Sequence, residues 1–232
     1  MTGWLTAQEW GIVLLSLRVS FWATLLSLPV GIAVALLLAR GRFPGHGLLN
    51  ALVHLPLVLP PVVTGYILLV VFGRRGPVGG WLEAQFDIVL AFRWTGAVLA
   101  AAIMAFPLMV RAIRLAVEAV DAGLEEAAAT LGAGPVLRFL TVTLPLILPG
   151  ILAGSVLAFA KAMGEFGATI TFVSAIPGQT QTVPSAIYAA LQVPDGEAGA
   201  LRLVLVSVLV ALGAVGVSEW LSRRTRKRVA GR

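Results

Sequence analysis

Long apolar stretches alternate with short polar segments along this chain. A helix that crosses the hydrocarbon core of a bilayer needs about 20 consecutive, mainly apolar residues. Five stretches approach or exceed that length, and each is predicted to form a membrane-spanning helix: about residues 12–39, 48–72, 94–115, 146–164 and 201–221. The pattern therefore predicts an all-α integral membrane protein, a single transmembrane domain over residues 1–232, with its two ends on opposite sides of the membrane.

Composition agrees with this pattern. Hydrophobic residues make up 59% of the chain and charged residues 12%, whereas an ordinary soluble domain is about 25% charged. The mean hydropathy is +0.96, which is too high for a soluble chain of this size. The absence of cysteine excludes disulfides and thiolate chemistry. The first stretch is too long for a signal-peptide core and lacks a basic segment before it, so an uncleaved helix is expected.

Basic residues predict the orientation, because lysine and arginine are retained on the cytoplasmic side. The net charge is +6. Basic residues mark the ends of the first, third and fifth stretches: Arg40, Arg42, Arg111, Arg114 and the run from Arg223 to Arg228. Arg74, Arg75 and Arg93 in the second loop oppose this bias. The balance predicts the N-terminus outside and the C-terminus in the cytoplasm, with residues 222–232 as a basic tail that anchors a helix end rather than binding nucleic acid.

The loop of residues 118–144 then lies in the cytoplasm. Its first part, residues 118–131, is rich in alanine and glutamate and is predicted to form one helix. Gly132, Gly134 and Pro135 end that helix, and a second short segment follows around Arg138. Pro145 suits the first turn of the next membrane helix. We therefore expect a short helix, a glycine turn and a return into the membrane, which together expose a surface to a soluble partner.

The spacing in this loop carries a family resemblance. Glu126-Ala127-Ala128 is followed by Gly132, then Val142 and Leu144-Pro145. This spacing resembles the cytoplasmic signature of permease subunits of binding-protein-dependent ABC importers, with valine where isoleucine is commonest. The resemblance implies the MetI-like ABC importer permease fold and a coupling helix that docks on an ATPase. By this resemblance Glu126 contacts the ATPase or fixes the loop, and Gly132 makes the turn. The residues assigned to ATPase coupling are Glu125, Glu126, Ala127, Ala128, Gly132, Leu144 and Pro145.

Partners follow from the same resemblance. They are two copies of an ABC ATPase, a periplasmic or lipid-anchored oxyanion-binding protein, a second copy of this chain, and the lipid bilayer of a bacterial or archaeal cytoplasmic membrane. No Gly-x-x-x-x-Gly-Lys-Ser/Thr loop occurs in the chain, so ATP and magnesium are expected on the separate ATPase. No cofactor or metal is expected in this chain. His46 lies in a predicted loop, and His54, within a span, is expected to be packed or hydrogen-bonded between helices rather than to bind a metal or haem. The chain is predicted not to be an enzyme.

Within the importers, four stretches resemble the molybdate permeases: residues 55–66, 96–121, 164–188 and 218–224. Molybdate, or tungstate, is the substrate that this resemblance implies. The sulfate and thiosulfate permeases share the Gly-Glu-Phe-Gly character at residues 164–167 and remain the alternative. An intramembrane enzyme would need a base near Ser155, and none is apparent. A passive anion channel would need no coupling loop.

Two regions are candidates for the translocation pathway, because irregular backbone at membrane depth is tolerated where it is buried or lines a cavity. In the first, Pro60 and Pro61 are expected to bend the second membrane helix beside Thr64 and Gly65. The alternative is a bend with a structural role only.

The second region begins at the end of the fourth stretch. Gly150, Gly154, Ala158 and Ala162 recur every four residues and predict a close helix contact. Lys161 and Glu165 lie one turn apart and are expected to pair, on the pathway or as a structural lock. The following segment is predicted to be a re-entrant loop with a short interfacial helix. Its pathway candidates are Thr169, Thr171 and Ser174, and the alternative is a plain polar loop.

Overall fold

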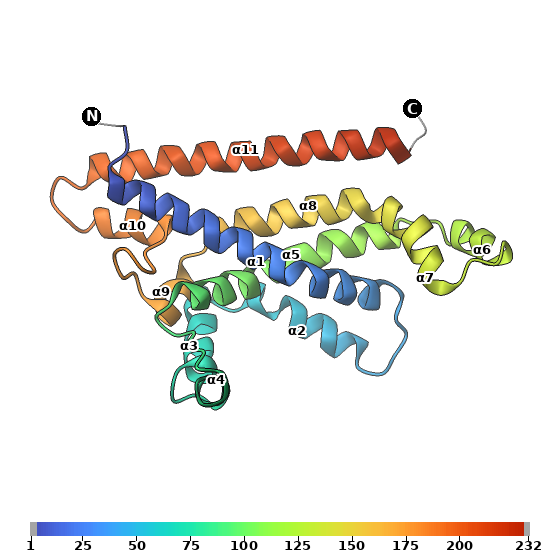
Figure 1. Cartoon of the computed structure of the whole chain (residues 1–232), viewed down its shortest axis with the longest axis horizontal. Coiled ribbons are helices and arrows are strands. Elements are labelled where there is room, and N and C mark those ends of the chain that lie inside the picture. The colour runs from blue at the N-terminus through green and yellow to red at the C-terminus, as the bar shows by residue number, and fades with distance from the viewer. Residues whose placement is uncertain (1–3, 230–232) are drawn as a thin grey trace.

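A computed structural model describes residues 4–229, with side chains as far as residue 217 and at Trp220. Residues 230–232 of the predicted basic tail lie outside the described residues. The described part contains helices and no strand, as predicted (Figure 1). The helices are α1 (Ala7–Arg40), α2 (His46–Val58), α3 (Pro61–Phe72), α4 (Pro77–Phe86), α5 (Trp94–Glu118), α6 (Ala122–Thr130), α7 (Pro135–Arg138), η1 (Phe139–Thr143, a π-helix), α8 (Leu144–Met163), α9 (Gly167–Val173), α10 (Val183–Ala190) and α11 (Glu197–Val229).

Four described helices are long and apolar enough to cross a membrane, and the pair α2 and α3 makes a fifth if it counts as one span. The four are Ala7–Arg40, Trp94–Glu118, Pro135–Met163 and Glu197–Val217. α5 lies at the centre, packed against α1 and α8, and α11 packs on α8 and α10. The two ends of the chain lie at opposite ends of the bundle (Figure 1). The predicted fold class is confirmed.

The second predicted span differs from expectation. The sequence predicts one bent helix over residues 48–72, but α2 and α3 are separate helices at an angle of 113°. The cause is the pair Pro60 and Pro61, neither of which has an N–H to continue the helix. The last turn of α2 ends where the Leu59 N–H donates to the Leu55 carbonyl, at 3.0 Å. Pro61 then occupies the first turn of α3, where its missing N–H costs nothing.

The predicted single helix over residues 118–131 is also wrong. α5 continues to Glu118, and α6 begins at Ala122 after a short break. Asp121 starts the new helix, because its side chain accepts a hydrogen bond from the Gly123 N–H at 2.9 Å. The cap reorients the chain so that α6 leaves the bundle rather than extending α5 (Figure 1).

The continuous helix that contains the fourth predicted span starts earlier than that span. α7, η1 and α8 follow one another without a break, so the apolar helix runs from Pro135 to Met163. The π-turn explains why Pro145 does not mark the start: in this wider turn the Leu144 N–H donates to the Phe139 carbonyl. The π-turn thus shifts the hydrogen-bond register just before Pro145, a residue that has no N–H to donate.

The contact between α5 and α8 is a major part of the bundle core, together with the contact between α1 and α5. Gly154, Ala158 and Ala162 of the small-residue stripe are buried. A Cβ at Gly150 would lie 2.2 Å from the Ala116 Cβ, and one at Gly154 would lie 3.1 Å from the Met109 carbonyl oxygen. The predicted close helix contact is therefore present. Helix α4 falls in a loop for which no helix was predicted.

Candidate functional site

The loop between α5 and α8 is fastened to the bundle by Glu125. This carboxylate accepts a hydrogen bond from the Arg40 guanidinium, at 2.6 Å, and another from the hydroxyl of Thr143. Arg40 is the last residue of α1, and Thr143 is buried in η1 at the start of the fourth membrane helix. One side chain of α6 thus connects the loop to two membrane helices. The sequence places Glu125 in the loop but gives no signal for its partners, which are 85 and 18 residues away.

The hydrogen bonds set the ionisation of Glu125. Partial burial by itself raises the pKa of this carboxyl group. The hydrogen bonds from Thr143 and Arg40, with the positive charges of Arg40 and Arg138, outweigh burial, so the pKa of Glu125 lies below its ordinary value of 4.5. The carboxylate is charged at neutral pH, which is the form that both donors require.

The next residue, Glu126, has the opposite environment. Its side chain is exposed and makes no hydrogen bond or ion pair within residues 4–217. Ala127 beside it is exposed, and Ala128 is half-buried. Within the described residues it is therefore Glu125, and not Glu126, that fixes the loop to the bundle.

A left-handed turn closes α6. Gly132 has φ +85°, a conformation that glycine adopts without strain. Its N–H donates to the Ala129 carbonyl at 3.0 Å, and the Ala133 N–H donates to the Ala128 carbonyl at 3.0 Å. The turn thus satisfies the helix end and returns the chain towards Leu144 and Pro145, both half-buried.

The tip of this loop is apolar. Leu131 is 88% exposed and Val136 is 73% exposed, and Leu124, Leu137 and Leu140 are also exposed. Exposed apolar side chains grouped around a turn are typical of a docking surface. We call these five residues with Glu126 the loop surface.

The pathway candidates lie together where α3 meets α9. A Cβ at Gly65 would lie 2.6 Å from the Ala168 carbonyl oxygen and 2.8 Å from the Thr171 Cβ, so only glycine permits this contact. Pro61 likewise packs against Gly167, and Pro60 precedes it. The hydroxyl of Thr64 is buried without a hydrogen-bond partner in the described part of the chain. An unpaired buried hydroxyl is costly, because it has lost its hydrogen bonds to water without a replacement.

Two other pathway candidates, Thr169 and Thr171, already donate hydrogen bonds to the backbone, and a third, Ser174, has a left-handed backbone conformation. The Thr169 hydroxyl donates to the Phe166 carbonyl at 2.9 Å, and that of Thr171 donates to the Gly167 carbonyl at 2.9 Å. Their protons are therefore used within α9 and are not offered to an anion. Ser174 is exposed and ends α9 with φ +62°, in the left-handed region.

Lys161 and Glu165 form the expected pair. The Lys161 Nζ lies 2.8 Å from Glu165 Oε2, and the Glu165 side chain is 1% exposed. Glu165 Oε1 also accepts the Ala168 N–H at 3.0 Å. The Glu165 carboxylate thus links α8 to α9 and caps the first turn of α9. These contacts are those expected of a structural lock.

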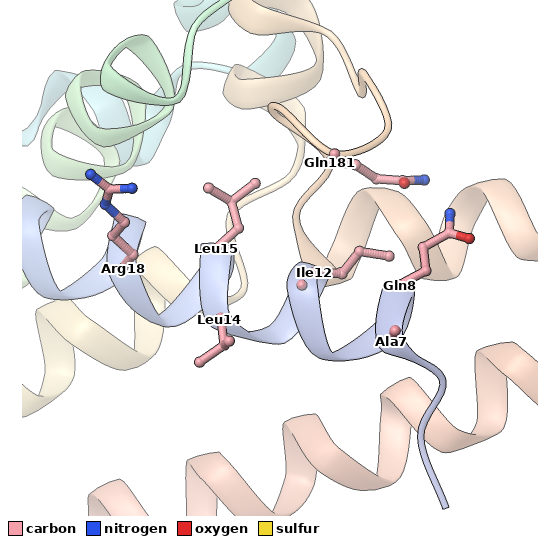
Figure 2. Close-up of a pocket in the computed structure, with 9 residues that line it drawn as sticks. Ala7, Gln8, Ile12, Leu14, Leu15, Arg18 and Gln181 are labelled. Atoms are coloured by element: carbon pink, nitrogen blue, oxygen red, sulfur yellow. The ribbon is translucent and has the colours of Figure 1, made fainter. Parts of the chain in front are cut away.

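A pocket of about 440 Å³ lies at the end of the bundle opposite the loop surface. It separates the first turns of α1 from the segment that carries Gly178 and Gln181 (Figure 2). Gln8 and Gln181 border one side, and Arg18 borders the other, across Ile12 and Leu15. The Arg18 guanidinium lies 3.8 Å from the ring centroid of Trp94, which begins α5. Its lining contains none of the coupling or pathway residues predicted from the sequence.

A helical membrane bundle with a fastened loop between its third and fourth spans defines the class: a transporter permease. A sequence model of the family described as "Binding-protein-dependent transport system inner membrane component" matches residues 27–227. The chain belongs to this family, and it is a transport subunit rather than an enzyme.

Individual proteins within this family differ in how similar they are to the chain. The chain is 61% identical to the molybdenum transport system permease protein ModB of Escherichia coli (strain K12), over 98% of this chain and 99% of that protein. It is 34% identical to the sulfate transport system permease protein CysT of Salmonella typhimurium, over 97% and 84% of the two chains. Among solved structures, a bacterial ABC transporter that imports the polysaccharide alginate matches with a TM-score of 0.74 and 19% identity, over 95% of this chain and 80% of that one. That likeness shows the fold.

Proposed function

We propose that this chain is the membrane-spanning subunit of an ATP-driven importer for molybdate. The observation that carries the proposal is the loop surface: Glu125 fastens α6 to α1 and η1, while Glu126 and the apolar residues beside it face outward. A rigidly held surface of this kind transmits a push from a soluble partner to the membrane helices. Five of the seven coupling residues assigned from sequence lie in this loop, and Leu144 and Pro145 begin α8 directly after it. Leu131 and Val136 join them.

The substrate assignment rests on similarity. Identity to the molybdenum permease of E. coli is 61%, against 34% to the sulfate permease. Sulfate therefore remains the weaker alternative. Tungstate has the same tetrahedral shape and charge as molybdate and is included in the proposal.

The partners are those that such an importer needs. Two ATPase subunits carry ATP and magnesium, and an external binding protein delivers the oxyanion. A second copy of this chain completes the pathway, because one chain with five spans does not enclose one. ATP binding brings the ATPases together, moves the two loops, and shifts the balance between inward-open and outward-open states.

The proposed orientation places the loop surface in the cytoplasm. Arg40, Arg42, Arg111 and Arg114 lie at the helix ends that adjoin this loop or the loop of residues 41–45. Retention of basic residues inside puts the N-terminus outside and the C-terminus in the cytoplasm. We place the path of the anion at the α3 and α9 region, with Pro60, Pro61, Thr64, Gly65, Lys161, Glu165, Thr169, Thr171 and Ser174 as its candidate residues. Of these, Thr169 and Thr171 line the path without offering their hydroxyl protons.

Uptake tests the proposal directly. The chain is reconstituted in proteoliposomes with its ATPase and binding protein, and uptake of labelled molybdate is measured with and without ATP and with excess sulfate. We expect uptake that requires ATP and resists sulfate. Full competition by sulfate would transfer the substrate to the alternative, and uptake without ATP would refute the importer.

A further inference from the structure

A pocket of about 310 Å³ opens between α2 and α5, near the ends of these helices that adjoin the loop surface. α2 contributes Asn50 and His54, and α5 contributes Arg111, Arg114 and Glu118. Leu115 completes the lining. The pocket thus brings two guanidinium groups, from Arg111 and Arg114, together near the end of an apolar bundle.

Arg114 is held in a fixed position. Its Nη1 donates to Asn50 Oδ1 at 3.0 Å, and its Nε donates to Glu118 Oε1 at 2.7 Å. The first bond ties α5 to α2, and the second neutralises the charge. Arg114 therefore lines the pocket in a fixed position and, with Glu118, adds little net charge.

Arg111 is different. Its side chain is exposed and makes no hydrogen bond or ion pair within the described residues. It lies seven residues before the end of α5, which is about 10 Å along the helix axis. The pocket therefore carries one uncompensated positive charge, from two arginines and one glutamate.

The remaining polar lining is oriented by α2. His54 Nδ1 lies 2.8 Å from the Asn50 carbonyl oxygen, which fixes the ring and assigns the Nδ1 proton to that bond. The Asn50 side chain is fixed by Arg114. The flexible group in the pocket is thus Arg111, whose planar fork matches two oxygens of a tetrahedral anion.

We propose that Arg111 and Arg114 form a binding site for a tetrahedral oxyanion group in this pocket. Two sources supply that chemistry: the transported oxyanion as it leaves the pathway, and the phosphate of an anionic lipid in the adjoining leaflet. The site itself follows from the geometry. Only its assignment to the exit side rests on the proposed function.

The test uses the complex of this chain with its ATPase, without the binding protein, in nanodiscs. One set contains phosphatidylcholine alone, and the other contains about one-fifth phosphatidylglycerol. Binding of labelled molybdate is measured by equilibrium dialysis, and retained phosphatidylglycerol by native mass spectrometry. The variant is Arg111→Gln. The matched control is Arg75→Gln, since Arg75 is also exposed and unpaired within residues 4–217 but lies between α3 and α4.

We expect Arg111→Gln to weaken the binding of one of the two ligands by about tenfold or more, which corresponds to the loss of a charge-assisted hydrogen bond. The control Arg75→Gln should bind both ligands as wild type does. Loss of molybdate binding in phosphatidylcholine identifies the free oxyanion, and loss of retained phosphatidylglycerol alone identifies the lipid. If Arg111→Gln retains both ligands as wild type does, or loses them only as much as Arg75→Gln, the inference is wrong. Uptake by the wild-type importer is measured separately, so a failure of the proposed function shows there and not here.

Discussion

The contact between α5 and α8 makes a sharp prediction at Gly150. The change Gly150→Ala adds a Cβ only 2.2 Å from the Ala116 Cβ, whereas two carbon atoms pack at about 3.5–4.0 Å. The helices must therefore separate by more than about 1 Å at this point. Overpacking of this kind costs about 1–3 kcal/mol, and we expect the unfolding temperature in detergent to fall by several degrees.

Two further variants make this test specific. Gly213→Ala is the matched control, because nothing lies within 4 Å of a Cβ added there in α11. It should leave the unfolding temperature unchanged or raise it slightly. Ala116→Gly removes the atom that clashes. The double variant Gly150→Ala/Ala116→Gly should therefore lose less free energy of unfolding than the sum of the losses in the two single variants. Equal unfolding temperatures for Gly150→Ala and Gly213→Ala would refute the reasoning.

The loop and the α8–α9 link make three more predictions. Glu125→Ala removes the hydrogen bonds to Arg40 and Thr143 and should lower the free energy of unfolding by about 1–3 kcal/mol, with loss of ATP-dependent uptake; stability loss with normal uptake would show that this link does not transmit motion. Because the pKa of Glu125 is lowered in the folded state, its stabilisation is present above the ordinary pKa of 4.5 and disappears as pH falls through the lower folded pKa. The difference in unfolding temperature between wild type and Glu125→Gln should therefore be constant from pH 7 to 5 and shrink below pH 4.5; a difference that shrinks already between pH 7 and 5 would contradict it. Glu165→Gln keeps an acceptor for the Ala168 N–H but leaves Lys161 unpaired, so thermal unfolding should rank wild type above Glu165→Gln and Glu165→Gln above Glu165→Ala, and equal stability of the last two would exclude the cap.

Much of the fold follows from the sequence because lipid imposes a simple rule: about 20 apolar residues span the core as a helix. The small-residue stripe and the pair of Lys161 with Glu165 also follow, since both depend on spacing within one helix. The direction that the chain takes after each proline or helix cap cannot be predicted from the sequence. Pro60 and Pro61 were expected to bend one helix but separate two, and Pro145 follows a π-turn that no local pattern announces.

The site shows the same limit. The turn at Gly132 can be read from sequence, because a left-handed residue is most often glycine. The partners of Glu125 and Arg114 cannot, since each contact joins segments that only the folded bundle brings together. Thr169 and Thr171 have the residue type expected of a pathway, but their protons bond to the backbone of α9, which residue type alone does not reveal.

The central claim is that the loop surface couples this chain to an ATPase. Leu131→Ser tests it most directly. The control is Leu48→Ser, because Leu48 is also an exposed leucine (66%, against 88% for Leu131) and lies in the first turn of α2, near the same end of the bundle. ATP-dependent molybdate uptake is measured for both in proteoliposomes with the ATPase and binding protein. We predict that Leu131→Ser reduces uptake about tenfold or more, as the loss of a central apolar contact does, while Leu48→Ser transports as wild type. Wild-type uptake by Leu131→Ser would contradict the claim.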